Sequence, residues 1–254
     1  MGKYDYYTLY DKPVLFKGLE IYPILMKDYW EFVQLAPILL IDIYSMSDTK
    51  ILSMKYLEYL FYEKDEDGEQ HYLPILAQLL RVVLRKKDEE ITKIESDGNP
   101  YLWVGSEGEK VVLDKNDFEE VRDIIIEQNL LSPPNYKIEK SLRDSMEEAR
   151  QIRKRMHGSD EAGIEDQVVA LMDETGISLD DIFSMTYRKF SKALERADHT
   201  LHYKIYLAAS MSGMVTFKDK SFVKHWLSEI KKNEFSELLE YNSVEKTINS
   251  GNTL

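Results

Sequence analysis

Apolar residues recur at steps of three and four between Thr186 and Ala208, and this is the strongest periodic signal in the chain. Such spacing places the residues along one side of an α-helix. The residues are Tyr187, Phe190, Leu194, Ala197, Leu201, Ile205 and Ala208. The pattern stops at Ser212-Gly213, where glycine favours a helix end. We therefore predict a long helix in this part of the chain.

Shorter periodic stretches predict further helices in the N-terminal half. They cover residues 28–40, 51–63 and 73–86. Proline removes a helical hydrogen bond, so Pro37 should kink or shift the first of them. Another helix should open at Asn116 or Asp117, since both residue types cap helices well.

The helical spacing of apolar residues is lost between residues 91 and 113. This stretch contains three short runs rich in strand-forming residues, separated by turn-forming segments. They predict an antiparallel meander of three strands. A sheet of this size needs a packed face, so it should lie on a helix. Residues 13–24 predict a hairpin that turns at Lys17-Gly18. Whether the hairpin joins the meander stays open.

A predicted domain boundary lies at Ser132-Pro133-Pro134-Asn135. Two prolines end the preceding helix, and Asn135 can cap a new one. We predict an α+β domain at residues 1–134 and a helical domain at residues 135–254, with a frayed tail after Tyr241. The expected fold class is mainly α with a small antiparallel β-sheet.

The second half contains a helix with an unusually narrow apolar stripe, predicted at residues 136–156. A globular helix normally shows a wider band, so this helix either bridges solvent or needs a partner. Residues 164–175 predict a helix that ends at Gly176. A last helix should start at Asp219, with Trp226 and Leu227 among its inward residues.

Composition excludes several function classes. The chain has no cysteine, which rules out disulfides, thiolate metal sites and a cysteine nucleophile. Its net charge of -13 argues against nucleic acid and against an anionic membrane as partners. No stretch reaches the length of about 20 apolar residues that a membrane span needs, so a soluble protein is expected.

One helix edge could in principle hold a metal. Glu195, His199 and His202 stand at i, i+4 and i+7. Zinc and iron sites commonly need a further ligand elsewhere, and no other histidine lies in a recognisable ligand motif, so packed histidines are the preferred interpretation. A metal-dependent enzyme stays an alternative. Phosphate-binding glycine loops and nucleophile elbows are absent from the sequence, so we expect no enzyme, no catalytic residues and no cofactor.

The 17 tyrosines are the most unusual feature of the composition. A tyrosine combines a large apolar ring with a polar tip, which suits half-buried positions and interfaces. Tyrosines near the N-terminus and the narrow stripe of the 136–156 helix are therefore the candidate partner-binding residues. These are Tyr6, Tyr7, Tyr10, Tyr136, Ile138, Leu142, Ala149 and Ile152.

Segments at both ends of the chain resemble tail-morphogenesis proteins of bacteriophages that infect Gram-positive bacteria. The segments are Gly18-Leu19-Glu20-Ile21-Tyr22-Pro23-Ile24, Lys27-Asp28-Tyr29-Trp30-Glu31-Phe32, Met185-Thr186-Tyr187-Arg188-Lys189-Phe190 and Leu201-His202-Tyr203. The resemblance implies a tail assembly chaperone without enzymatic activity. Such a chaperone binds the tape-measure protein in the host cytoplasm and is absent from the finished particle.

Two other functions fit the same resemblance. One is a structural tail or baseplate component that stays in the virion. The other is a small phage effector that binds a host protein. In each case the partner is a protein, and whether the chain also forms a homo-oligomer stays open.

Overall fold

The computed structural model describes residues 4, 7, 10–64, 70–96, 99–105, 110–135, 138–157, 162–213 and 225–228, without the side chains of residues 150 and 153–157. The chain divides into two units. The first comprises residues 1–134 and 178–192, and the second comprises residues 135–177 and 193–254. The sequence-based prediction placed a single boundary after residue 134. The structure in addition assigns residues 178–192 to the first unit.

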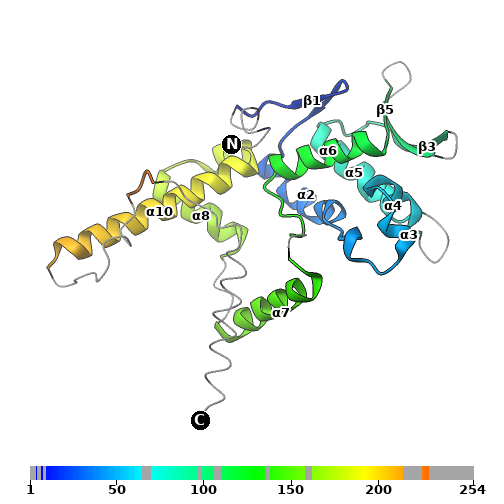
Figure 1. Ribbon diagram of the computed structural model, residues 1–254. Helices are drawn as coiled ribbons and strands as arrows, with labels where there is room; N and C mark the ends of the chain where they lie inside the picture. The colour runs from blue at the N-terminus through cyan, green and yellow to red at the C-terminus, as the bar shows by residue number, and fades with distance from the viewer. Residues whose placement is uncertain are drawn as a thin grey trace, which may run out of the picture. The chain divides into compact units, whose positions relative to one another are not determined.

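The first unit contains two small antiparallel sheets, which agrees with the predicted mainly α fold class with little β-sheet (Figure 1). Strands β1 (Val14–Phe16) and β2 (Leu19–Ile21) form the expected hairpin, with Gly18 at a φ of 89° in its turn. Strands β3 (Ile91–Ser96), β4 (Asn99–Val104) and β5 (Val111–Leu113) form the expected meander. Within the described residues the hairpin and the meander are separate sheets.

Helices contribute more residues to the first unit than strands do. Up to residue 134 they are, in chain order, η1 (Met26–Asp28), α2 (Tyr29–Leu35), η2 (Ala36–Leu39), η3 (Ile43–Ser45), α3 (Thr49–Leu52), α4 (Tyr56–Tyr62), α5 (Tyr72–Leu84) and α6 (Lys115–Gln128). Pro37 has the expected effect, because the α-helix gives way to a 3₁₀ turn around it. The single helix predicted at residues 51–63 is wrong: α3 and α4 are separate helices with a break at residues 53–55.

The core of the first unit gathers around α5. Its residues Leu76, Leu79, Leu80 and Val83 follow the i, i+3, i+4, i+7 pattern and are all buried, as the periodicity predicts. Leu102 of β4 and Phe118 of α6 are buried in the same cluster. The sheet therefore has the packed face that a three-stranded meander needs.

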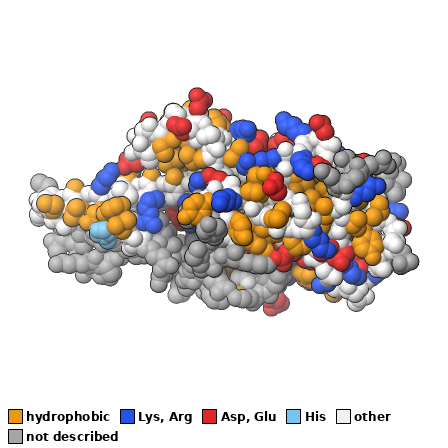
Figure 2. Space-filling model, turned by 90° about the horizontal axis from the view of Figure 1, so that it is seen from above, with side chains coloured by type: hydrophobic (Ala, Val, Ile, Leu, Met, Phe, Trp, Pro, Cys, Tyr) orange, Lys and Arg blue, Asp and Glu red, His pale blue; other side chains and the backbone are white. Residues whose placement is uncertain are grey.

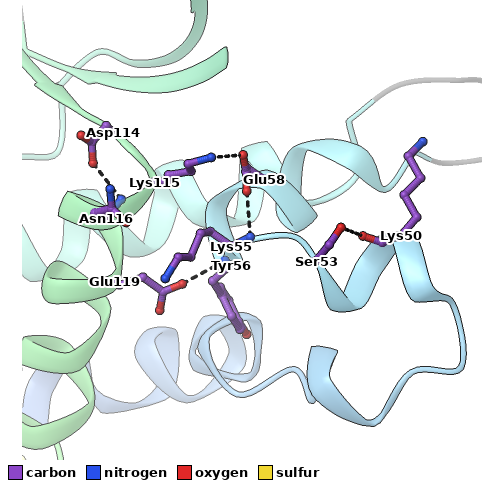
Figure 3. A network of polar contacts seen from close by, with 9 residues as sticks. All are labelled: Lys50, Ser53, Lys55, Tyr56, Glu58, Asp114, Lys115, Asn116 and Glu119. Atoms are coloured by element: carbon purple, nitrogen blue, oxygen red, sulfur yellow. Dashed lines mark hydrogen bonds and ion pairs between the residues drawn. The ribbon is translucent and has the colours of Figure 1, made fainter. Parts of the chain in front are cut away.

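A hydrogen bond and an ion pair link the N-termini of α4 and α6 (Figure 3). A carboxylate oxygen of Glu119 in α6 accepts a hydrogen bond from the backbone N–H of Tyr56 at 2.9 Å. In return, Nζ of Lys115 lies 2.7 Å from Oε1 of Glu58 in α4. The first N–H groups of a helix have no partner within the helix, so Glu119 satisfies a donor that α4 leaves unpaired.

Two carboxyl groups at these helix starts have pKa values below their ordinary values. Asp114 caps α6 by accepting hydrogen bonds from the backbone N–H groups of Asp117 and Asn116, and the bond from Asp117 is the main reason that the pKa of Asp114 is lowered. Burial raises the pKa of Glu58, but hydrogen bonds from Lys115 and from the backbone of Lys55 outweigh it and lower that pKa overall. Asp114 is therefore the cap of α6, two or three residues before the expected Asn116 or Asp117.

Helix α9 (Leu179–Ser184) and the first turns of α10 (Tyr187–Met211) pack within the first unit. The backbone N–H of Met26 donates to the carbonyl of Met185 at 2.9 Å, and that of Tyr187 donates to the carbonyl of Ile24 at 3.0 Å. The side chains of Ile182 and Phe190 are buried. These backbone bonds next to the hairpin explain why residues 178–192 belong to the first unit.

In its described residues the second unit is mainly helical. It contains α7 (Lys140–His157), α8 (Ile164–Thr175) and the part of α10 from residue 193 onward. Gly176 ends α8 with a φ of 72°, as predicted. Residues 225–228 form a turn in which Trp226 and Leu227 are exposed, so the prediction that they point inward is wrong. The rest of the helix predicted from Asp219 lies outside the described residues.

Candidate partner-binding surface

The C-terminal half of α10 carries an exposed apolar stripe. Leu201, Ile205 and Ala208 stand at i, i+4 and i+7, which places them on one side of the helix. Leu201 is 44% exposed and Ile205 is 53% exposed, and Ala208 is exposed as well. Figure 2 shows hydrophobic side chains gathered over this part of α10, at the left of the view. We call these three residues the distal stripe.

The other side of the same helix has a partner within the second unit. Nη1 of Arg196 donates to the backbone carbonyls of Trp226 and Ser228, at 2.6 and 3.1 Å. The ring of Tyr203 lies 5.4 Å from that of His225. At 100° per residue, Arg196 and Tyr203 point away from Leu201. The turn at residues 225–228 therefore contacts α10 on the side opposite to the distal stripe.

Charged residues border the distal stripe. Lys204 lies beside Leu201, and its Nζ is 2.7 Å from Oε1 of Glu174 in α8. Asp198 lies one turn before Leu201 on the other border, with one carboxylate oxygen 3.4 Å from Nδ1 of His202. Both pairs are largely exposed, so each contributes little to stability. These two pairs determine which charges lie next to the distal stripe.

Both histidines on the helix edge considered for a metal site make other polar contacts. Nε2 of His199 lies 3.0 Å from Oγ of Ser228, and His202 pairs with Asp198. Among the residues that the structure describes, no group of three histidine or carboxylate side chains is placed to hold a metal ion. His199 therefore contacts a neighbouring hydroxyl group, while His202 is exposed and lies beside a carboxylate of the same helix.

The candidate partner-binding residues chosen from the sequence lie in different surroundings. Ile138 is buried, while Leu142, Ala149 and Ile152 are partly buried. Met146 on the same side of α7 is buried too and was missed by the sequence prediction. Tyr7 and Tyr10 are exposed. Tyr6 and Tyr136 lie outside the described residues.

The sequence showed the periodicity of the distal stripe but not its exposure. Leu201, Ile205 and Ala208 belong to the strongest periodic signal in the chain, yet none of them was among the candidate partner-binding residues. Apolar spacing indicates that a helix side favours burial, and it carries no information about which surface covers that side. Exposure could be found only by placing the surrounding elements.

Comparisons with known proteins bear on this same region. Residues 154–231 match the family model of the second domain of YomV, which is a family associated with Bacillus phages. That range includes the whole of α8, α9 and α10, and hence the distal stripe. No curated protein and no solved structure matches the chain.

In the described part of the chain, no helix combines the length and the apolar character required to cross a bilayer.

Proposed function

We propose that this protein is a chaperone of bacteriophage tail assembly that binds a helical region of the tape-measure protein and has no enzymatic activity. The observation that carries the proposal is the distal stripe, an exposed apolar side of a long helix. A groove or face of this kind is the surface on which an amphipathic partner helix docks. The match of residues 154–231 to a phage-associated domain family supports the viral setting.

The sequence resemblance at both ends of the chain supports the same function. The distal stripe includes Leu201, which is itself part of one of the resembling segments. A tape-measure protein is long and helical and exposes apolar surface before the tail tube surrounds it, so it needs a partner that covers this surface. Under this proposal the protein acts in the host cytoplasm and is absent from the finished particle.

Co-expression with the tape-measure protein of the same phage tests the proposal. The wild-type chain should keep the tape-measure protein in the soluble fraction and co-purify with it. Ile205→Asp places a charge in the distal stripe and should abolish both effects. Ser210→Asp is the matched control, because Ser210 is an exposed residue of α10 away from the stripe. Equal co-purification by both variants would contradict binding through the stripe.

Quantitative mass spectrometry of purified virions separates the chaperone from its main alternative. A chaperone should be absent or present only in traces. Stoichiometric amounts would show a structural tail or baseplate component and would refute the chaperone function. Binding to a host protein alone, without binding to the tape-measure protein, would favour an effector.

A further inference from the structure

We infer that the helix received by the distal stripe is basic, with Lys and Arg bordering its apolar residues. The inference rests on the proposed function and adds the chemistry of the partner to it. It is carried by the charges that lie around the stripe in the second unit, and each of these charges can be reversed by a point substitution.

Within the part of the chain that the structure describes, Lys204 is the cation at the border of the stripe, and a carboxylate neutralises it. Lys204 pairs with Glu174 at 2.7 Å, so this border offers a partner no net positive charge. Asp198 occupies the other border, with one carboxylate oxygen 3.4 Å from Nδ1 of His202. Among the described residues at the border, the carboxylates of Asp198 and Glu174 therefore outnumber the one lysine side chain.

The C-terminal end of helix α8 adds to this negative field. The helix carries Glu165, Asp166, Asp173 and Glu174 and contains no Lys, Arg or His. Its four carboxylate residues are exposed, and Glu174 connects α8 to the stripe border through Lys204. At an ionic strength of about 0.1 M charges act over roughly 10 Å, so the C-terminal end of α8 contributes to the field that a docked helix would meet.

The combination of an apolar stripe and an acidic border selects one class of partner. Apolar residues of the incoming helix would be covered by Leu201, Ile205 and Ala208. Its flanking residues would lie near Asp198 and the end of α8, where acidic residues are repelled and basic residues are attracted. The net charge of -13 adds a weaker repulsion of acidic partners at long range.

Two synthetic helical peptides test the inference with the full-length chain. Both carry the same leucine stripe, and the flanking positions are Lys in one and Glu in the other. The Lys-flanked peptide should bind about tenfold or more tightly, which corresponds to about 1.4 kcal/mol. Fluorescence anisotropy measures both affinities. Raising the salt concentration from about 0.05 M to about 0.5 M should reduce the difference, because added salt screens exposed charges.

Substitutions on both borders assign the preference to the named residues. Glu174→Lys combined with Asp198→Lys should remove or reverse the preference for the Lys-flanked peptide. Ile205→Asp should weaken binding of both peptides, and Ser210→Asp should leave the preference in place. Circular dichroism of each variant confirms that α-helical content is unchanged.

The outcomes separate this inference from the proposed function. Equal or tighter binding of the Glu-flanked peptide, still lost in Ile205→Asp, overturns the inference and leaves the proposed function standing. Failure of both peptides to bind also overturns the inference, while co-expression with the tape-measure protein judges the function separately. Light scattering tests the remaining possible occupant of the stripe, which is a second copy of this chain. A stable dimer that Ile205→Asp converts to a monomer would show that a second copy covers the stripe.

Discussion

Two helices of this protein carry the same apolar spacing, but the apolar side is buried in one and exposed in the other. In α5, Leu79 is fully buried and Leu80 is nearly so. In the distal half of α10, Leu201 and Ile205 keep about half of their surface exposed, at 44% and 53%. A periodic apolar pattern thus predicts a helix with one side that favours burial, whereas the neighbouring elements decide whether that side is covered.

The neighbours of the two helices explain the difference. Helix α5 packs against α2, α4, β2 and β3, which surround its apolar side. The distal half of α10 is contacted by the turn at residues 225–228 on the side away from its stripe, and Lys204 reaches Glu174 at the stripe's border. The first helix is therefore part of a core, and the second has an apolar side that the described elements leave exposed.

The largest expected effect is at α5. Leu79→Ala removes a fully buried side chain and leaves a cavity, so the free energy of unfolding should fall by about 2–5 kcal/mol. Urea unfolding followed by circular dichroism measures the change. If the free energy of unfolding falls by less than about 1 kcal/mol, the buried side chain of Leu79 contributes little to stability. That result would contradict the contrast between a buried side of α5 and an exposed side of α10.

A smaller loss is expected from a buried polar residue that joins the hairpin region to α6. Oδ1 of Asn129 accepts a hydrogen bond from the backbone N–H of Ile24 at 3.0 Å, and its Nδ2 donates to the carbonyl of Ile125 at 2.9 Å. Asn129→Ala leaves these groups without that partner and should cost about 1–3 kcal/mol. The same urea experiment measures it, with the exposed Gln34→Ala as a control that should be nearly neutral.

The cap of α6 should contribute about 1 kcal/mol in a pH-dependent way. Asp114→Ala removes the carboxylate that accepts the N–H bonds of Asn116 and Asp117. Folding lowers the pKa of Asp114, so its stabilisation is present above the unfolded pKa near 4 and is lost as the pH falls through the folded pKa. The difference between wild type and variant should therefore shrink below about pH 4.

Unfolding measured at several pH values tests this expectation. Asp88→Ala serves as the control, since Asp88 is exposed in the loop after α5. A difference between wild type and Asp114→Ala that stays constant down to pH 2 would show that the charge of Asp114 has no part in capping α6.

The smallest effect on stability should come from the distal stripe. Ile205→Ser replaces a half-exposed side chain, so the free energy of unfolding should change by less than about 0.5 kcal/mol. The same substitution should reduce partner binding. If unfolding instead loses more than about 2 kcal/mol, Ile205 is covered within the folded chain and the distinction from α5 disappears.

Much of the fold could be predicted because local signals agree with the structure. The turn at Lys17-Gly18, the three runs of the meander, Gly176 at the end of α8 and the periodicity of α10 all act over a few residues. The break between α3 and α4 could not be predicted in this way. Its Tyr56 N–H is satisfied by Glu119, which lies 63 residues further along the chain.

By itself the sequence determined that this chain is mainly helical with small sheets, contains no cysteine and is strongly acidic, because composition and periodicity depend only on which residues follow one another. The tertiary structure decided which apolar sides are covered. It placed residues 178–192 in the first unit through backbone bonds to Ile24 and Met26. It left Leu201 and Ile205 exposed, since burial depends on neighbours distant in sequence that no local pattern encodes.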